Sequence, residues 1–247
     1  MFLLLNNFNQ IAEFNKRRYK DHKAFISESN FLEDKVYLYK IYSQIIKLNI
    51  KNTAQTKILD IGCADGSFAN FLAHKGFNVY GIDISEEAIK KASVFGIKAS
   101  QCDIEQGLKF KDNYFDIIIA SEIIEHLYDT DYFLEEIKRV TKKYGYLFIS
   151  TPNLASLKNR VRLLFGRYPQ YTEYRIGRNL AGHIRNYTPQ VLKKQLKDNR
   201  WNVIKTTSPN ILCPMTKDIP IFIKKIAIFF GDIFYSLGSH IIIIARK

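Results

Sequence analysis

The feature that most constrains the fold is a glycine-rich turn between a short apolar run and an amphipathic segment. The apolar run covers residues 57–62, and the turn over residues 60–66 reads Asp-Ile-Gly-Cys-Ala-Asp-Gly. Residues 67–75 then have the pattern of a helix. Glycines at such a junction let the backbone approach a ligand closely at the helix N-terminus. The sequence therefore predicts a strand, a ligand-binding turn and a helix in this order.

A carboxylate closes the next apolar run. Residues 77–82 are a predicted strand, and Asp83 follows it, 21 residues after Gly62. An acid at the tip of this strand is placed to accept hydrogen bonds from ribose hydroxyls. Ser85 is a predicted N-cap, because two glutamates follow it in the first turn of a helix. These features predict a nucleoside-containing cofactor at the carboxyl ends of parallel strands.

Strands and helices go on alternating, which favours an α/β fold with a parallel sheet covered by helices on both faces. Further strands are predicted at 97–101, 115–120, 145–150, 201–207 and 240–245. Helices are predicted at 31–48, 131–141, 154–165 and 189–197, the last with Thr188 as N-cap and Pro189 at its first position. Residues 166–187 are expected to form a loop or lid, and residues 211–237 are a hydrophobic segment.

Composition narrows the class of protein. The chain has 247 residues, 47% of them hydrophobic, which suits one α/β domain with an elaboration or two small domains. Its three cysteines include no CxxC pair, so we expect no disulfide scaffold, no metal site and a reducing, cytoplasmic compartment. We also predict neither a signal peptide nor a transmembrane segment.

The formal charge of +13 is unevenly distributed. Residues 1–56 hold 9 basic and 5 acidic side chains, residues 57–152 hold 11 and 15, and residues 153–247 hold 17 and 4. Arginine binds phosphate bidentately, so the basic segment at 158–185 predicts recognition of a small anionic acceptor, with a solvated surface as the alternative. The residues predicted to bind the acceptor are Arg167, Arg175, Arg178, Arg185, Tyr171 and Tyr187. A weak membrane-surface contact is a further option, through residues 219–237.

The core resembles class I S-adenosylmethionine-dependent methyltransferases. The turn at 60–66 is similar to their first motif, (D/E)xGxGxG, with alanine in place of the middle glycine. Residues 102–104 resemble the segment that meets adenine, and residues 115–127 and 150–153 resemble the small-molecule branch that includes quinone O-methyltransferases. The resemblance implies S-adenosylmethionine as cofactor, bound by Asp60, Gly62, Cys63, Ala64, Gly66, Asp83, Ile84, Asp103, Ile104 and Ser121.

The resemblance also implies the architecture. It is a Rossmann-like sheet of seven mostly parallel strands with the last strand antiparallel. We expect residues 1–56 to be an N-terminal helical segment covering the cofactor site and residues 57–152 to be the S-adenosylmethionine-binding core. Residues 153–247 would then supply an Arg/Tyr-rich substrate cover and the final strands of the same domain. The expected assembly is a monomer or a homodimer.

Methyl transfer to a hydroxyl needs a general base, and histidine is the first candidate. His183 lies in a His-x-Arg-x-Tyr-Thr stretch similar to one in methyltransferases of surface-polysaccharide clusters. His126 follows the fourth predicted strand, where a buried structural role is the alternative, and Glu122 is the nearest carboxylate. His74 and His240 are expected to be structural.

The resemblance implies O-methylation of a small anionic, carbohydrate-related or phosphorylated acceptor in surface-glycan (capsule) biosynthesis. Four alternatives stay open: a quinone or lipid methyltransferase, another small-molecule O- or N-methyltransferase, an RNA methyltransferase, and a non-catalytic S-adenosylmethionine-binding protein. Nucleic acid is not expected as a partner, because the Asn/Asp-Pro-Pro-Tyr/Phe motif of many base methyltransferases is absent near Ser121.

Overall fold

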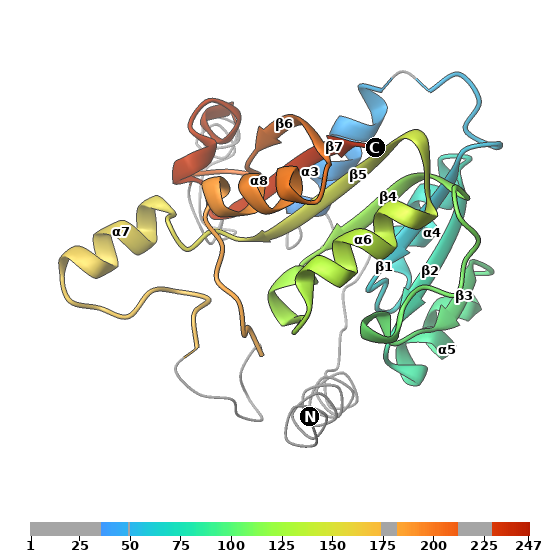
Figure 1. Cartoon of the computed structure of the whole chain (residues 1–247), viewed down its shortest axis with the longest axis horizontal. Coiled ribbons are helices and arrows are strands. Elements are labelled where there is room, and N and C mark those ends of the chain that lie inside the picture. Colours follow the sequence, from blue (N-terminus) through green and yellow to red (C-terminus); the bar gives the residue numbers. More distant parts are fainter. Residues whose placement is uncertain (1–35, 49, 174–181, 212–228) are drawn as a thin grey trace.

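The computed structural model describes residues 36–48, 50–173, 182–211 and 229–247. Within these ranges a seven-stranded sheet runs in the order β3-β2-β1-β4-β5-β7-β6, with helices on both faces (Figure 1). Its strands are β1 (Lys57–Ile61), β2 (Asn78–Asp83), β3 (Lys98–Gln101), β4 (Phe115–Ser121), β5 (Thr141–Pro152), β6 (Asn202–Thr207) and β7 (His240–Arg246). The first five strands pair in parallel, and β7 is antiparallel to both β5 and β6. The predicted Rossmann-like sheet with an antiparallel last strand is thus confirmed.

Helices follow the strands in the predicted alternation. They are α3 (Val36–Ile46), α4 (Ser67–His74), α5 (Glu86–Val94), α6 (Thr130–Val140), α7 (Leu157–Leu164) and α8 (Pro189–Asp198). Short 3₁₀ turns lie at Ile104–Gln106, Ile124–His126 and Tyr235–Leu237. The hydroxyls of Ser85 and Thr188 accept hydrogen bonds from the first turns of α5 and α8, which confirms both predicted N-caps.

Successive residues of the central strands enter two separate cores, as the pleat of a sheet requires. On one face, Leu59 and Ile118 lie in a cluster with the apolar sides of α6 and α8. On the other face, Ile58 and Ile117 lie in a cluster with α3, α4 and α5. Helices cover both faces of the sheet, so a ligand-binding site can form only at the ends of the strands.

Among the fully described elements, two differ from their predicted bounds by three residues or more. β5 is longer than the predicted 145–150, because it pairs with β4 across a bulge at its start and with β7 up to its last residue. The helix predicted from residue 154 begins only at Leu157, because Asn153 still forms a parallel bridge with a later segment of the chain. Both changes come from pairing between distant segments, which local patterns do not record.

The predicted N-terminal segment is described only in part. α3 packs on the sheet, where Leu38, Ile41 and Ile45 join the second core, and Lys40 forms an ion pair of 2.6 Å with Asp232. Residues 1–35 and most of the hydrophobic 211–237 segment lie outside the described residues, so the expected cover over the cofactor site stays a prediction. No helix among the described residues is long and apolar enough to span a bilayer.

Candidate active site

The carboxyl ends of β1, β2 and β4 border an open cleft. It lies where the strand order reverses between β1 and β4, which is the place where open α/β sheets bind ligands. Five of the ten predicted cofactor residues line it: Gly62, Asp83, Ile84, Asp103 and Ile104. The other lining residues are Ile82, Cys102, Glu105, Ile123, His126 and Leu127.

The turn after β1 has the left-handed backbone that its composition allows. The φ angles of Gly62, Ala64 and Gly66 are 72°, 49° and 77°. A Cβ on Gly62 would lie 2.2 Å from the side chain of Ile123, and a Cβ on Gly66 would lie 2.7 Å from that of Ala92. Both outer positions therefore require glycine, whereas alanine holds the middle one at a conformational cost of about 1 kcal/mol.

Asp83 ends β2 with its carboxylate buried in the cleft wall. One carboxylate oxygen accepts the backbone N–H of Ala64 and the other accepts that of Ser85, both at 2.9 Å. Burial raises the pKa of Asp83, while the backbone N–H groups of Ser85, Ala64 and Ile84 oppose that shift. A carboxylate oxygen can accept more than one hydrogen bond. The anchored group therefore retains acceptor capacity for ribose hydroxyls in the cleft.

The rest of the wall suits an adenosine group. Ile84, Ile104 and Leu127 give it an apolar lining. Asp103 is fixed as the N-cap of a 3₁₀ turn, where it accepts the backbone N–H of Glu105 at 3.2 Å. An apolar cleft with a few fixed polar groups is the usual form of a cofactor site. The residues present thus fit the cofactor that the sequence resemblance implies.

The other predicted cofactor residues support the turn or lie beside it. Asp60 and Cys63 are buried, and Gly66 is the N-cap of α4. Burial raises the pKa of the Cys63 thiol, and the negative charges of Asp60 and Asp83 add to the shift, so this thiol stays protonated. Ser121 ends β4 with its hydroxyl 2.7 Å from that of Ser150, on the next strand.

The two predicted catalytic histidines lie together although they are far apart in the sequence. Their ring centroids are 4.8 Å apart, His126 lines the cofactor cleft, and His183 lines a second, small cavity. Nδ1 of His126 lies 3.0 Å from the carbonyl oxygen of Gly182, and Nδ1 of His183 lies 2.8 Å from that of Tyr171. A carbonyl only accepts, so Nδ1 carries the proton and Nε2 is the acceptor nitrogen of each neutral ring.

Glu122, the third predicted catalytic residue, follows β4 in a conformation that non-glycine residues rarely adopt, with φ 57°. One carboxylate oxygen accepts the hydroxyl of Ser150 at 2.8 Å, and the other lies 3.5 Å from Nε2 of His240. Strained backbone of this kind is concentrated at functional sites. β4, β5 and β7 therefore each contribute a polar side chain to one cluster.

His240, for which the sequence predicts a structural role, lies beside Glu122 in the structure. It starts β7 and pairs with Pro152, the last residue of β5. The signal for its position was available, because an antiparallel last strand begins at the edge where the parallel strands end. The ring of His240 lies 5.6 Å from that of Tyr171 between centroids, and Tyr171 lines the second cavity.

The predicted acceptor-binding residues divide into three groups. Tyr171 and Arg185 line the second cavity with His183, and the Arg185 guanidinium also donates to the carbonyl oxygen of Tyr128 at 2.6 Å. Two others do not line that cavity. Tyr187 is buried, with its hydroxyl donating to Gln195 at 3.1 Å, whereas Arg167 is exposed just beyond α7. Arg175 and Arg178 lie outside the described residues.

One further cluster has the composition of a cation site. Glu125, His126 and His183 each present a ligand atom within 4.8 Å of the others. A carboxylate with two imidazoles is a donor set that zinc and ferrous iron accept. The same imidazoles are the candidate bases, and the expectation of a metal-free protein stays a prediction.

Comparison with known proteins agrees with this geometry. A family model described as "Methyltransferase domain" matches residues 52–203. The chain is 35% identical over 127 residues to a ubiquinone biosynthesis O-methyltransferase of Pelagibacter ubique, covering 49% of this chain and 52% of that protein. It is 34% identical over 118 residues to the mitochondrial enzyme of the same name from Homo sapiens, covering 44% and 32% of the two chains. The match thus spans about half, or less, of the length of these relatives.

Solved structures share the fold. A SAM-dependent methyltransferase from Archaeoglobus fulgidus aligns with TM-score 0.57 and 19% identity over 90% of this chain and all of its own. A SAM-dependent methyltransferase from Methanosarcina mazei aligns with TM-score 0.59 and 21% identity over 82% and 96% of the two chains. At these identities the likeness concerns the fold alone.

These comparisons also correct one expectation. The relatives named above work in ubiquinone biosynthesis, and they give no support to the expected likeness to surface-polysaccharide enzymes. The core resemblance itself is confirmed, as is the cofactor that it implies. With its glycine turn, its acid at the tip of β2 and its sheet order, the chain belongs to the methyltransferase domain family, a family of S-adenosylmethionine-dependent methyltransferases.

Proposed function

We propose that the protein methylates a hydroxyl oxygen of a small-molecule acceptor, of the phenolic or quinol type that its relatives' names suggest. The observation that carries this proposal is the contact between His126 and His183, with ring centroids 4.8 Å apart. One ring belongs to the cofactor cleft and the other to the second cavity. An acceptor in the second cavity would therefore meet an imidazole beside the cofactor.

His183 can accept the proton that the acceptor hydroxyl loses during methyl transfer. Because Nδ1 of His183 is held by the carbonyl oxygen of Tyr171, Nε2 can take the hydroxyl proton while the acceptor oxygen attacks. S-adenosylmethionine supplies an electrophilic methyl group on a sulfonium sulfur, so a carbon–oxygen bond forms as a carbon–sulfur bond breaks. The products are the methyl ether and S-adenosylhomocysteine, and the proton passes from the imidazole to water. His126, fixed by Gly182, lines the same junction.

The quinone-type acceptor is preferred because two named relatives share that activity and about a third of the aligned residues. An anionic, carbohydrate-related acceptor is the second candidate. Arg185 favours it, since this guanidinium lines the second cavity with His183, in the strongly basic last third of the chain. Both candidates use the same cofactor cleft and the same base, so they differ only in what fills the second cavity.

A methylation screen tests the proposal. The protein would be incubated with S-adenosylmethionine labelled in its methyl group, and with quinols, phenols, nucleotide sugars, phosphorylated sugars and RNA in separate reactions. We expect label on oxygen of a phenol or quinol. Label on a sugar would favour the second candidate, and label on RNA or on nitrogen would reject both. Cofactor binding by calorimetry without transfer to any acceptor would indicate the non-catalytic alternative.

A further inference from the structure

α7 projects from the edge of the sheet (Figure 1). Most of its apolar side chains are exposed. Leu164 is 80% exposed and Phe165, directly after the helix, is 72% exposed. Residues spaced by three or four positions share one face of a helix, so Leu157, Val161, Leu164 and Phe165 form a single apolar stripe. Leu163 and Tyr168 extend the exposed apolar area. This set is called the α7 surface below.

Hydrogen bonds on the side opposite the exposed stripe hold α7 in place. Asn159, on the side opposite the stripe, is 1% exposed. Its side-chain oxygen accepts the backbone N–H of Gln170 at 2.7 Å, and its side-chain nitrogen donates to the carbonyl oxygens of Asn153 and Gln170 at 3.3 and 3.2 Å. The hydroxyl of Ser156 caps the first turn. The fold therefore holds the stripe outward, facing away from the body of the protein.

The positive charge around the α7 surface indicates which kind of partner it can bind. The residues from 153 to 172 include no acid and four basic side chains, Lys158, Arg160, Arg162 and Arg167. Arg160 and Arg162 each use Nε to donate to a nearby carbonyl oxygen at 2.8 Å, which leaves their positive charge in place. A second copy of the chain docked through this surface would bring like charges together. An anionic lipid surface instead offers both negative headgroups and an apolar interior.

We propose that α7 docks the protein on an anionic membrane surface. The apolar stripe enters the interfacial layer, and the four basic side chains contact the headgroups. The helix is also tied to the acceptor cavity, because Gln170 is bonded to Asn159 and the next residue, Tyr171, holds His183. Docking would bring that cavity close to the bilayer, where an apolar acceptor is concentrated; only this consequence rests on the proposed function.

Vesicle co-sedimentation tests the docking. Wild-type protein would be mixed at low salt with vesicles of phosphatidylcholine, or with vesicles of phosphatidylcholine and phosphatidylglycerol. We expect at least about tenfold more binding to the anionic vesicles, falling as salt is added. The double variant Leu164→Asp, Phe165→Asp should lower that binding about tenfold or more, since both positions are exposed and the fold does not depend on them.

The matched control is the double variant Val94→Asp, Phe95→Asp. Val94 is 84% exposed and Phe95 is 47% exposed at the end of α5, on another part of the surface, so these changes add the same two negative charges without touching the α7 surface. The control should bind anionic vesicles as the wild type does. Equal vesicle binding by the double variant and the wild type would overturn the proposal. A concentration-dependent dimer that the double variant abolishes, with no vesicle binding, would instead assign the surface to a second copy of the chain.

Discussion

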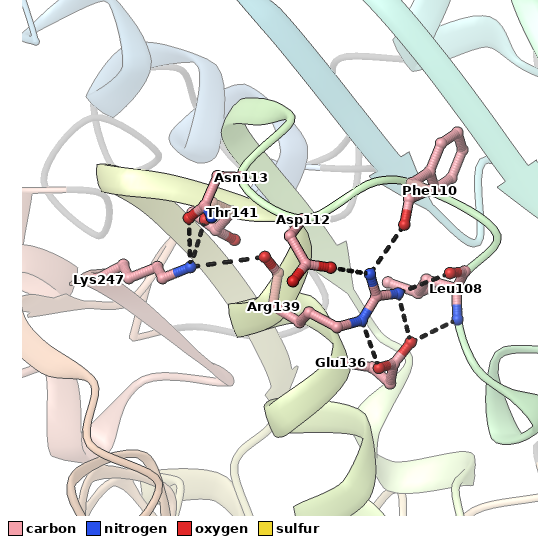
Figure 2. A network of polar contacts seen from close by, with 8 residues as sticks. All are labelled: Leu108, Phe110, Asp112, Asn113, Glu136, Arg139, Thr141 and Lys247. Carbon is pink, nitrogen blue, oxygen red and sulfur yellow. Dashed lines mark hydrogen bonds and ion pairs between the residues drawn. The ribbon is translucent and has the colours of Figure 1, made fainter.

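The two edges of the sheet use polar side chains in opposite ways. At the edge where the parallel strands begin, Arg139 makes five hydrogen bonds, two to the backbone of the loop before β4 and three to Asp112 and Glu136 (Figure 2). Lys247, just after β7, donates to Asn113 and to the carbonyl oxygen of Thr141. Every N–H of the Arg139 guanidinium thus has a partner, and charge is balanced locally.

At the edge where the parallel strands end, the same sheet presents imidazoles and carboxylates to two cavities. His126 and His183 each have Nδ1 fixed by a carbonyl oxygen. Positive φ occurs at both edges, at Ala64 and Glu122 here and at Asn113 and Tyr144 on the other edge. The two edges therefore differ in their side chains, since charged groups pair with one another at the first edge and line cavities at the second. Five experiments test this difference.

The largest effect is expected at His183. His183→Ala removes the proposed base, so kcat should fall about 100-fold to 1,000-fold while the Kd for S-adenosylhomocysteine stays unchanged. Turnover and calorimetry would measure the two quantities. His74→Ala is the matched control, because His74 lies at the end of α4 with Nδ1 near the carbonyl oxygen of Asn70. Full turnover by His183→Ala would exclude this residue as the base.

Cofactor affinity should respond next. Asp83→Asn replaces a buried carboxylate that accepts the backbone N–H groups of Ala64 and Ser85. Losing charged hydrogen bonds to the turn and to ribose should raise the Kd for S-adenosylmethionine about 100-fold. Calorimetry with the wild type and the variant gives the ratio. An unchanged Kd would place the ribose elsewhere.

A substitution at the edge where the parallel strands begin should lower the stability of the protein without changing its affinity for the cofactor. Arg139→Met removes the guanidinium, so two backbone carbonyl oxygens and two carboxylates lose the hydrogen bonds that it donates. The free energy of unfolding should therefore fall by about 2 kcal/mol. The Kd for the cofactor should not change. Urea denaturation measures the first and calorimetry the second. Lys194→Met, which breaks an exposed pair with Asp198, is the control and should change stability by less than about 0.5 kcal/mol.

This stability difference should depend on pH. Hydrogen bonding to Arg139 lowers the pKa of Glu136 below its ordinary value of 4.5. The stabilisation is therefore fully present above pH 4.5 and is lost as pH falls through the lowered pKa. The gap in Tm between wild type and Arg139→Met should shrink as acid is added below that pH. A difference in Tm that stays constant as the pH falls below 4.5 would mean that the charge of Glu136 does not contribute to stability.

The smallest effect is expected at Ala64. Ala64→Gly relieves the positive φ of 49° but adds backbone entropy to the unfolded chain. These two effects nearly cancel, so the free energy of unfolding should change by less than about 1 kcal/mol. The N–H that reaches Asp83 is kept, and cofactor affinity should be retained. A large loss of either quantity would show that the alanine methyl group has a role in the turn.

About half of the residues that line the cofactor cleft could be predicted from the sequence. Gly62, Asp83, Ile84, Asp103 and Ile104 belong to segments that end neighbouring strands, and parallel strands bring their ends to one edge. The acceptor half could not be predicted to the same extent. His183 reaches His126 through a loop with no regular pattern, so its contacts depend on the whole fold.

Local patterns in the sequence were enough to predict the strand–turn–helix order, the N-caps at Ser85 and Thr188 and the acid at the tip of β2, because each depends on residues close together in the chain. Only the tertiary structure placed His240 beside Glu122 and turned the apolar stripe of α7 away from the core. Those outcomes depend on the pairing of β5 with β7 and on which faces the other helices already cover. Contacts of that kind join residues far apart in sequence, and no local pattern records them.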